Sequence, residues 1–331
     1  MYFVLNCIFI ERLVKQVRDI TVAMAIYKPN LTWLKEELQS IKNQTYQHFE
    51  VLVWNDCPED CYDYNSFFSE VLGDIPFKIY KGEKNEGSNK AFECLTEKVE
   101  TKYIAYCDQD DIWLPNKLEV LREFLLSPDN TLAFSDMMVI DKDSNITARH
   151  IQEVRPRQIF YSGKDAFQHL LAKNFVTGCT MLMKTQIAKA AIPFPNAVFH
   201  DWWLAIAASL KGDIVMANSP LMKYRIYGGN QSAVLRGIDS KKDYFLRRIV
   251  SQNDLIKQVD QVWGPDLRID FAKEWTEARI KYFNHPSLKD LRILLSMKSF
   301  NRTTVLFECL LPFFPEFLFK YIIHAVQRGQ I

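Results

Sequence analysis

The stretch YIAYCDQDDIW, residues 103–113, joins an apolar run directly to three carboxylates, Asp108, Asp110 and Asp111. Like charges at this spacing repel one another and raise one another's pKa, so the cluster needs a compensating cation. Carboxylate oxygens are ligands that Mg²⁺ and Mn²⁺ prefer. An Asp-x-Asp pair alone is also typical of a solvated turn. The preceding apolar run and the third Asp favour a metal site, where a divalent ion could neutralise a leaving diphosphate.

Three earlier apolar runs have the pattern of buried strands and lead into polar residues. They span residues 20–27, 50–54 and 77–80. Apolar residues at helical spacing follow the first run over 31–41, and strands that alternate with helices predict a mainly parallel α/β sheet. Ligands of such sheets bind beyond the carboxyl ends of the strands. Asp56 and the 108–111 cluster stand at such ends.

Composition excludes several classes of protein. Lys and Arg number 41 against 40 Asp and Glu, so the net charge of +1 argues against a nucleic-acid partner. Seven cysteines without a CxxC pair indicate neither a disulfide framework nor a zinc site, and the reducing cytosol fits best. The apolar opening, 1–10, is too short for a membrane span and lacks the features of a signal peptide, so we expect an extra strand or helix there.

The segment CDQDDIWLPNKL, residues 107–118, resembles the metal-binding signature of family 2 glycosyltransferases with the GT-A fold. The subgroup it is most similar to includes bacterial rhamnosyltransferases. The resemblance covers about residues 20–230, because further segments fall in the family's order. These are 21–27, 44–46, 55–56, 85–87, 178–179 and 200–203. It implies a nucleotide-diphospho-sugar transferase fold, α/β with a mainly parallel central sheet and a C-terminal helical extension.

The resemblance and the pattern along the chain predict four parts. An N-terminal extension over 1–19 precedes a nucleotide-sugar-binding half over 20–135. An acceptor-binding half over 136–237 mixes aromatic and acidic residues. A helical region over 238–331 begins with one long helix that ends before Gly264-Pro265.

In the donor half, the resemblance implies that Asp110 and Asp108 bind Mg²⁺ or Mn²⁺, with Asp108 also near the ribose, and that Asp111 supports the loop. Asp56 would accept the imide N–H of a uracil or thymine, although an Asx-turn is the alternative. Lys90 would approach the base or diphosphate, unless it is simply solvated. Tyr27 would line the base pocket, unless it is a core or edge aromatic.

In the acceptor half, the resemblance makes Asp201 the general base that deprotonates the acceptor hydroxyl, whereas its alternative role is a helix N-cap. Trp202 and Trp203 could form a platform for a sugar. His200 could orient Asp201 or contact the diphosphate, or it could be purely structural.

The segment from Tyr224 to Asn230 resembles the part of the family that closes over the diphosphate. Relatives often have a His where Tyr227 stands, and a neutral phenol is a poor metal ligand, although it can donate a hydrogen bond to phosphate. Arg225 is expected to bind the diphosphate. The departure at Tyr227 puts a third protein contact to the metal in doubt.

Together these features predict an inverting enzyme that moves one sugar from a dTDP- or UDP-linked donor, with dTDP-rhamnose as the first expectation. The acceptor would be a glycan or lipid-linked molecule of cell-surface polysaccharide biosynthesis, at the cytoplasmic side of the membrane. The C-terminal stretch 317–328 has a wide apolar face that either packs on the catalytic domain or lies in a lipid interface. The alternatives are a sugar-1-phosphate nucleotidylyltransferase and a catalytically silent binding module.

Overall fold

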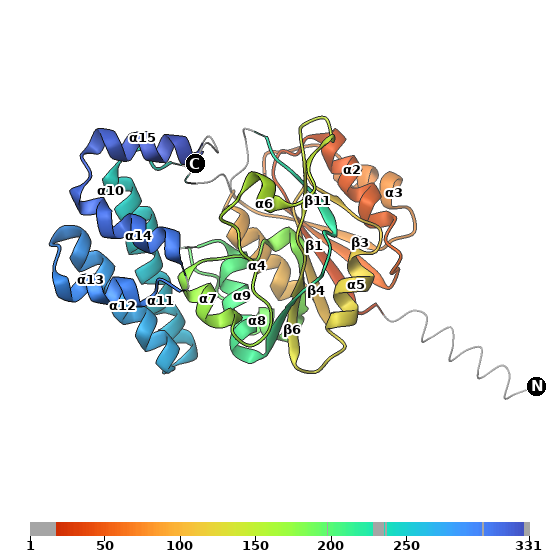
Figure 1. The fold of residues 1–331 in the computed structure, drawn as a ribbon. Coiled ribbons are helices and arrows are strands. Elements are labelled where there is room, and N and C mark those ends of the chain that lie inside the picture. Colours follow the sequence, from red (N-terminus) through yellow and green to blue (C-terminus); the bar gives the residue numbers. More distant parts are fainter. Residues whose placement is uncertain (1–17, 197, 228–234, 236, 300, 328–331) are drawn as a thin grey trace, which may run out of the picture.

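The structure, a computed structural model, describes residues 18–196, 198–227, 235, 237–299 and 301–327. Most of the predicted N-terminal extension therefore lies outside the described residues, as do Arg328 and the Gly228–Asn230 end of the segment expected near the diphosphate. An α/β body forms one side of the molecule and a group of helices from the C-terminal part of the chain forms the other (Figure 1).

The α/β body is built on a seven-stranded sheet with the order β10-β6-β9-β4-β1-β2-β3. The four predicted strands are present in the predicted order. They are β1 Ile20–Ile26, β2 Phe49–Asn55, β3 Phe77–Lys81 and β4 Tyr103–Cys107. Strands β6 Asn130–Phe134, β9 Met181–Lys184 and β10 Asp213–Met216 complete the sheet. Every strand runs parallel to β1 except β9, which is antiparallel to both β4 and β6. The expected mainly parallel sheet is confirmed.

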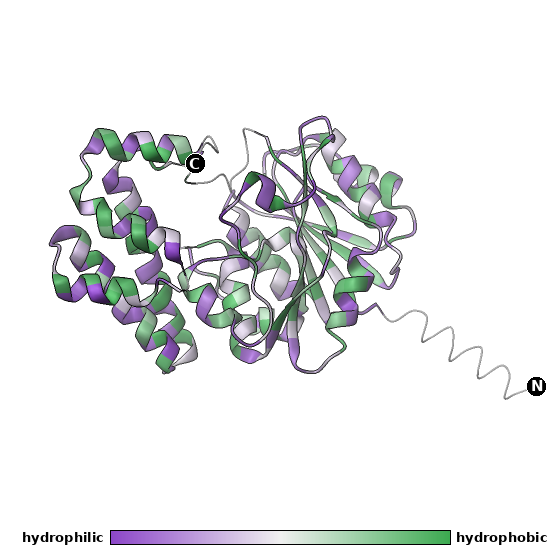
Figure 2. Cartoon of the chain, viewed as in Figure 1, coloured by the Kyte–Doolittle hydropathy of each residue, from purple (hydrophilic) through white to green (hydrophobic). Residues whose placement is uncertain are grey.

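Helices cover both faces of this sheet. Alternate residues of β1, including Val22 and Met24, pack against Leu34 and Leu38, while Ala23 faces the opposite core. One layer contains α2 Leu31–Lys42, α3 Tyr64–Leu72 and α5 Lys117–Phe124. The other contains α4 Ser88–Lys98, α7 Ala166–Ala172, α8 Thr185–Ala190 and α9 His200–Lys211. Figure 2 shows that hydrophobic residues concentrate in the strands between these layers.

A second, four-stranded sheet has the order β5-β11-β7-β8. Its strands are β5 Ile112–Trp113, β7 Met138–Ile140, β8 Ile146–Ala148 and β11 Met222–Arg225, and the short helix α6 Ile151–Val154 follows β8. Strand β5 directly follows Asp111 and pairs with β11, which ends two residues before Tyr227. This pairing brings the carboxylate cluster and the 225–227 segment together.

The C-terminal region is helical, as predicted. The long helix before Gly264 is continuous through α10 Lys241–Tyr244, a π-helical turn at Phe245–Val250 and α11 Ser251–Trp263. It is followed by α12 Leu267–Asn284, α13 Leu288–Ser296, α14 Arg302–Leu310, a 3₁₀ turn at Leu311–Phe313 and α15 Glu316–Gln327. None of the helices within the described ranges is long and apolar enough to cross a bilayer.

Helix α15 packs on the helical region and leaves part of its apolar surface open. Phe319 and Ile323 are buried in a cluster with Tyr244 of α10, whereas Phe317 is 76% exposed and Tyr321 is 72% exposed. The prediction that this helix packs on the catalytic domain is therefore wrong, because its buried residues pack on the helical region instead.

Candidate active site

The ends of β1, β2 and β4 place Tyr27, Asp56 and Asp108 along one edge of the sheet. Gln109 joins two of these ends, because its side-chain Oε1 accepts the backbone N–H of Tyr27 at 2.7 Å and its Nε2 donates to the carbonyl of Tyr27 at 3.2 Å. The Tyr27 ring is left 44% exposed at the rim. No motif indicated this role of Gln109 beyond its place between the aspartates.

The three aspartates are held in a protein environment that opposes their ionisation. Burial, and then the neighbouring Asp110 and Asp201 carboxylates, raise the pKa of Asp108 to about 7. Burial also raises the pKa of Asp110, and it raises that of Asp111 well above the usual range. Asp111 Oδ2 is buried without a hydrogen-bond partner among the described residues. Crowded carboxylates with an unpaired oxygen fit a hard divalent cation such as Mg²⁺ or Mn²⁺.

Asp108 and Asp111 are grouped with a residue that had no predicted role, Cys179. Their ligand atoms all lie within 4.8 Å of one another, and this group does not include Asp110. Cys179 belongs to the 3₁₀ turn Gly178–Thr180 before β9. Burial raises the pKa of its thiol well above the usual range, so the sulfur stays protonated at neutral pH. The carboxylates are therefore better suited than Cys179 to a hard cation.

A buried lysine near the three aspartates supplies positive charge that partly compensates their carboxylates. Lys117 is fully buried, with Nζ 3.5 Å from the centroid of the Trp113 ring, and its charge lowers the pKa of Asp108. Glu37 is also fully buried, and burial raises the pKa of its carboxyl to about 8. Lys117 is part of the 107–118 segment, but its role could not be predicted because a lysine at a helix start is normally solvated.

Tyr227 contacts the cluster directly. Its hydroxyl donates to Asp110 Oδ2 at 2.6 Å, and its ring lies 4.8 Å from that of Trp33. Burial and the Asp110 carboxylate raise the pKa of the phenol, so it remains a neutral donor. The phenol thus orients the Asp110 carboxylate.

Arg225 is fully buried and already bonded to protein groups. Its guanidinium forms an ion pair with Glu36 at 2.6 Å, lies over the Trp33 ring and donates to the carbonyl of Asp110 at 2.8 Å. Its backbone N–H donates to Asp111 Oδ1 at 2.9 Å. This environment contradicts the expected direct contact between Arg225 and a diphosphate. Arg225 instead holds the aspartate loop against β11.

Asp201 lies in the first turn of α9, where Phe199 and not Asp201 occupies the N-cap position. Its Oδ1 accepts from the backbone N–H of Trp202 at 2.6 Å and from Asn174 Nδ2 at 3.1 Å, and its Oδ2 accepts from Gly178 N–H at 3.2 Å. Burial raises the pKa of Asp201 to about 6, although these hydrogen bonds oppose the increase. A carboxylate with this pKa is suited to accept a proton near neutral pH.

The neighbours of Asp201 differ from the expected platform. Trp203 is 1% exposed and donates through Nε1 to the Ala191 carbonyl, so the prediction that it contacts an acceptor is wrong, because no face of its ring is open. Trp202 is partly buried and donates through Nε1 to the Leu170 carbonyl.

His200 is structural rather than a ligand for phosphate. Its ring packs 4.2 Å from Phe92, and burial lowers its pKa to about 3, so it is neutral. Neither ring nitrogen has a hydrogen-bond partner among the described residues. A Cβ at Gly178 would lie 2.8 Å from His200 Nε2, which explains why a glycine is needed there.

Directly after β2, Asp56 accepts hydrogen bonds from the backbone N–H groups of Glu86 at 3.1 Å and Gly87 at 2.8 Å. Gly87 has a φ of 85°, a conformation that favours glycine, directly before α4. Lys90 forms an ion pair with Glu93 one turn later. Asp56 thus fixes the loop before α4, and its oxygens retain further acceptor capacity.

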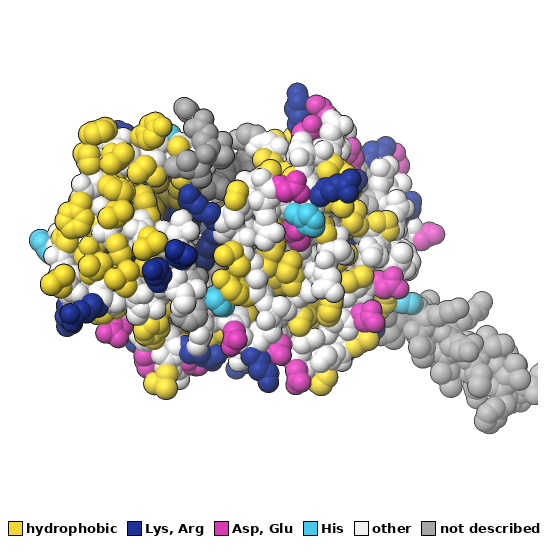
Figure 3. Space-filling model, in the orientation of Figure 1, with side chains coloured by type: hydrophobic (Ala, Val, Ile, Leu, Met, Phe, Trp, Pro, Cys, Tyr) yellow, Lys and Arg dark blue, Asp and Glu magenta, His cyan; other side chains and the backbone are white. Residues whose placement is uncertain are grey.

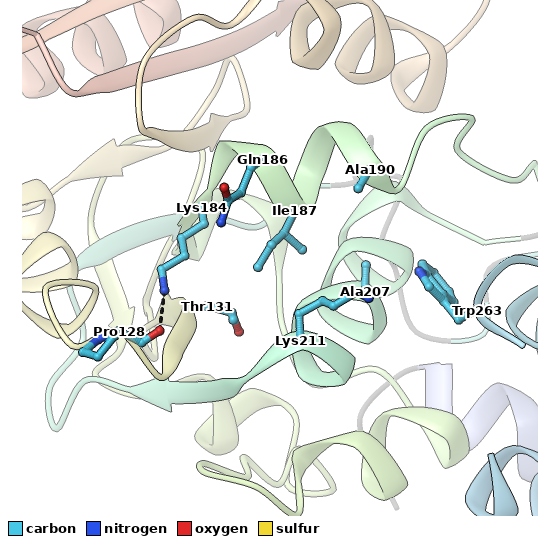
Figure 4. A pocket seen from close by; sticks show the side chains of 9 residues that line it. All are labelled: Pro128, Thr131, Lys184, Gln186, Ile187, Ala190, Ala207, Lys211 and Trp263. Atoms are coloured by element: carbon cyan, nitrogen blue, oxygen red, sulfur yellow. Dashed lines mark hydrogen bonds between the residues drawn. The ribbon is translucent and has the colours of Figure 1, made fainter. Parts of the chain in front are cut away.

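A cavity of about 480 Å³ lies at the opposite edge of the sheet (Figure 4). Lys184, Lys211 and Trp263 contribute to its wall, and Lys184 pairs with Tyr103 at the start of β4, the end remote from Asp108. This cavity is separate from the carboxylates and is not the candidate active site.

Comparisons with known proteins agree with this geometry. Residues 21–190, just over half of the chain, match the sequence profile of glycosyl transferase family 2. A UDP-Glc:alpha-D-GlcNAc-diphosphoundecaprenol beta-1,3-glucosyltransferase of Escherichia coli is 25% identical over 209 residues, which cover 62% of this chain and 77% of the relative.

Two solved structures share the GT-A fold. TarS of S. aureus in complex with UDP-GlcNAc is similar with a TM-score of 0.60 at 13% identity, over 94% of this chain and 92% of that one. A mannosyltransferase of Pyrobaculum calidifontis in complex with GDP-Man and Mn²⁺ is similar with a TM-score of 0.51 at 13% identity, over 89% and 85% of the two chains.

Proposed function

Because the chain belongs to glycosyl transferase family 2, we propose that it transfers a single sugar from a nucleotide-diphosphate donor to a glycan or lipid-linked acceptor with inversion at the anomeric carbon. The observation that carries this proposal is the position of Asp201. Its carboxylate has a pKa of about 6 and lies close enough to Asp108 to raise the pKa of that group. Asp201, a proton acceptor, thus lies beside the carboxylates that would hold the nucleotide-sugar donor.

In this proposal Asp201 takes the proton of the acceptor hydroxyl. The hydroxyl oxygen forms a bond to the anomeric carbon while the bond from that carbon to the diphosphate breaks, and the nucleoside diphosphate leaves with the electron pair. Bound Mg²⁺ or Mn²⁺ supplies charge neutralisation for the diphosphate. Asp110 and Asp108 would hold that ion, and Tyr227 and Arg225 fix the loop that carries them.

We propose a UDP- or dTDP-linked donor, in which Asp56 accepts the imide N–H of the base. The remaining acceptor capacity of Asp56 at the end of β2 supports this role, and so does the UDP-linked donor in the name of the Escherichia coli relative. Tyr27 would line the base and Lys90 would lie near the base or diphosphate. A dTDP-rhamnose donor is supported by the resemblance of residues 107–118 alone.

We further propose that the acceptor lies at the inner face of a membrane, in cell-surface polysaccharide biosynthesis. Figure 3 shows hydrophobic side chains gathered over the C-terminal helices. Leu310, Phe313, Phe317 and Tyr321, the apolar face, are all more than half exposed, and Lys320 is exposed beside them. Aromatic side chains next to a cation are typical of contact with a lipid interface. The name of the Escherichia coli relative includes a diphosphoundecaprenol-linked acceptor.

The proposal is tested by calorimetry with UDP, dTDP and GDP, each with and without Mn²⁺, followed by turnover of UDP- and dTDP-sugars. We expect UDP or dTDP to bind more tightly with Mn²⁺ and to raise the melting temperature. A silent module would bind nucleotide without releasing it from any donor. A nucleotidylyltransferase would instead form a nucleotide sugar from sugar 1-phosphate and nucleoside triphosphate, and that result would overturn the proposal.

A further inference from the structure

A buried polar chain connects the helical region to the loop that holds Asp201. Arg279 of α12 forms a two-point ion pair with Glu308 of α14, at 2.6 Å and 2.5 Å, and Tyr244 of α10 donates to the same carboxylate at 3.0 Å. The remaining terminal nitrogen of Arg279, Nη1, donates to Gln252 Oε1 at 2.6 Å. All four side chains are buried.

Gln252 continues this chain into the catalytic domain. Its Nε2 donates to the carbonyls of Leu171 at 2.8 Å and Ala172 at 2.9 Å. These are the last two residues of α7, whose carbonyls have no partner within the helix. Because Arg279 holds the Oε1 atom, the amide is oriented with both of its donors toward α7. Gln252 therefore fixes the point at which α7 ends.

The loop after α7 leads directly to the candidate base. Asn174 lies two residues beyond Ala172, and its Nδ2 donates to Asp201 Oδ1 at 3.1 Å. Its own Oδ1 accepts the N–H of Val176 at 3.0 Å, which fixes the amide. Any displacement of the end of α7 is thus transmitted to one of the three groups that hold the Asp201 carboxylate.

We infer that Gln252 is a positioning residue for Asp201, acting through the end of α7 and Asn174, so that the helical region forms part of the support of the catalytic base. The inference rests on the proposed function, since it takes Asp201 as the base. It also places the helices that carry the apolar face in mechanical contact with the site, because Glu308 belongs to α14.

The test replaces Gln252 by Met, which keeps the length of the side chain and removes both donors. Gln252→Glu is a second variant, because a carboxylate retains the contact with Arg279 and cannot donate to the α7 carbonyls. The matched control is Thr276→Val, which removes a buried hydrogen bond of 3.1 Å to Asn253, also between α11 and α12, from a side chain that donates no hydrogen bond to α7.

We expect kcat to fall between about 10-fold and 10²-fold in either Gln252 variant, since small displacements of reacting groups have effects of this size. KM for the donor and the affinity for UDP with Mn²⁺ should stay within about twofold of wild type. Thr276→Val should lower the melting temperature and leave kcat within about twofold. In an Asn174→Ala background, Gln252→Met should cause no further loss of kcat, because the two residues act in series.

An unchanged kcat in both folded Gln252 variants would overturn the inference. The inference would also be overturned if the loss of kcat in Gln252→Met multiplied with the loss in Asn174→Ala. An equally large loss of kcat in Thr276→Val would overturn it too. Failure of the proposed function is distinguished by Asp201→Asn: if that variant keeps full turnover, Asp201 is not the base. If it loses turnover while Gln252→Met does not, the proposed function stands and only the link through Gln252 fails.

Discussion

Replacing Asp201 by Asn tests the proposed chemistry most directly, because the change removes the ability to accept a proton and keeps the shape. We expect kcat to fall by on the order of 10² to 10⁴, the usual contribution of a positioned general base. At 1.36 kcal/mol for each factor of ten, this corresponds to a barrier higher by about 3 to 5 kcal/mol.

The hydrogen bonds of Asp201 add a structural effect that has to be separated from the chemical one. The Asn oxygen can replace Oδ1 and still accept from Trp202 and Asn174, but its amide would then face the N–H of Gly178. A donor left without an acceptor costs about 1–3 kcal/mol of stability. Asp165→Asn is the matched control, since it makes the same change at the start of α7, where the side chain forms no capping hydrogen bond.

The assay measures kcat from pH 5 to pH 8, together with the affinity for UDP and Mn²⁺. With a pKa of about 6, Asp201 is protonated and inactive at the acid end, so wild-type kcat should rise with pH and level off above about pH 7. The Asn variant should be slow at every pH and bind UDP normally. An Asn variant with the wild-type kcat would refute the assignment. So would a variant whose kcat still rose with pH by as much as that of the wild type.

Three sites and one surface give further predictions. Asp110→Ala should abolish the tightening of UDP binding by Mn²⁺, and calorimetry at several Mn²⁺ concentrations would show an unchanged metal effect if the assignment is wrong. Tyr227→His places a nitrogen donor beside Asp110, so half-maximal activity should need less Mn²⁺ while the Mg²⁺ requirement changes little; metal titrations of turnover check this. Trp203→Ala should lower the free energy of unfolding by about 3–5 kcal/mol in urea titrations, and a loss below 1 kcal/mol would contradict its place in the core. The double change Phe317→Ser and Tyr321→Ser should reduce sedimentation with anionic liposomes more than it reduces donor hydrolysis. If the double variant sedimented with liposomes as well as the wild type does, the apolar face would be excluded as the contact.

The strands and helices that the sequence predicted are those with a local signal. The run at 20–27 is apolar and rich in β-branched residues, and it leads into a helical pattern at 31–41; both elements form within a residue or two of these bounds. The antiparallel strand β9 was not predicted, because three apolar residues and a lysine do not reveal which neighbours they pair with.

The errors at the site arise from interactions between distant residues. Trp203 and Trp202 are adjacent in the sequence, and only the packing of α9 shows that one ring is buried in the core. The resemblance led us to expect Arg225 at the diphosphate, and its ion pair with Glu36 was missed because Glu36 lies 189 residues earlier in the chain. Asn174 and Gln252 are single polar residues without a motif, so their connection to Asp201 could be recognised only from the folded structure.

The central place of β9 in the sheet bears on the rigidity of one wall of the site. The turn Gly178–Thr180 passes straight into a strand that is hydrogen-bonded to neighbours on both sides, β4 and β6. Amide hydrogens in such a strand exchange with solvent only through rare openings that disrupt a large part of the domain. We therefore expect the Gly178 side of the Asp201 site to keep one shape on the timescale of turnover. If Asp201 is the base, we expect an acceptor that does not fit against this wall to be rejected rather than accommodated by induced fit.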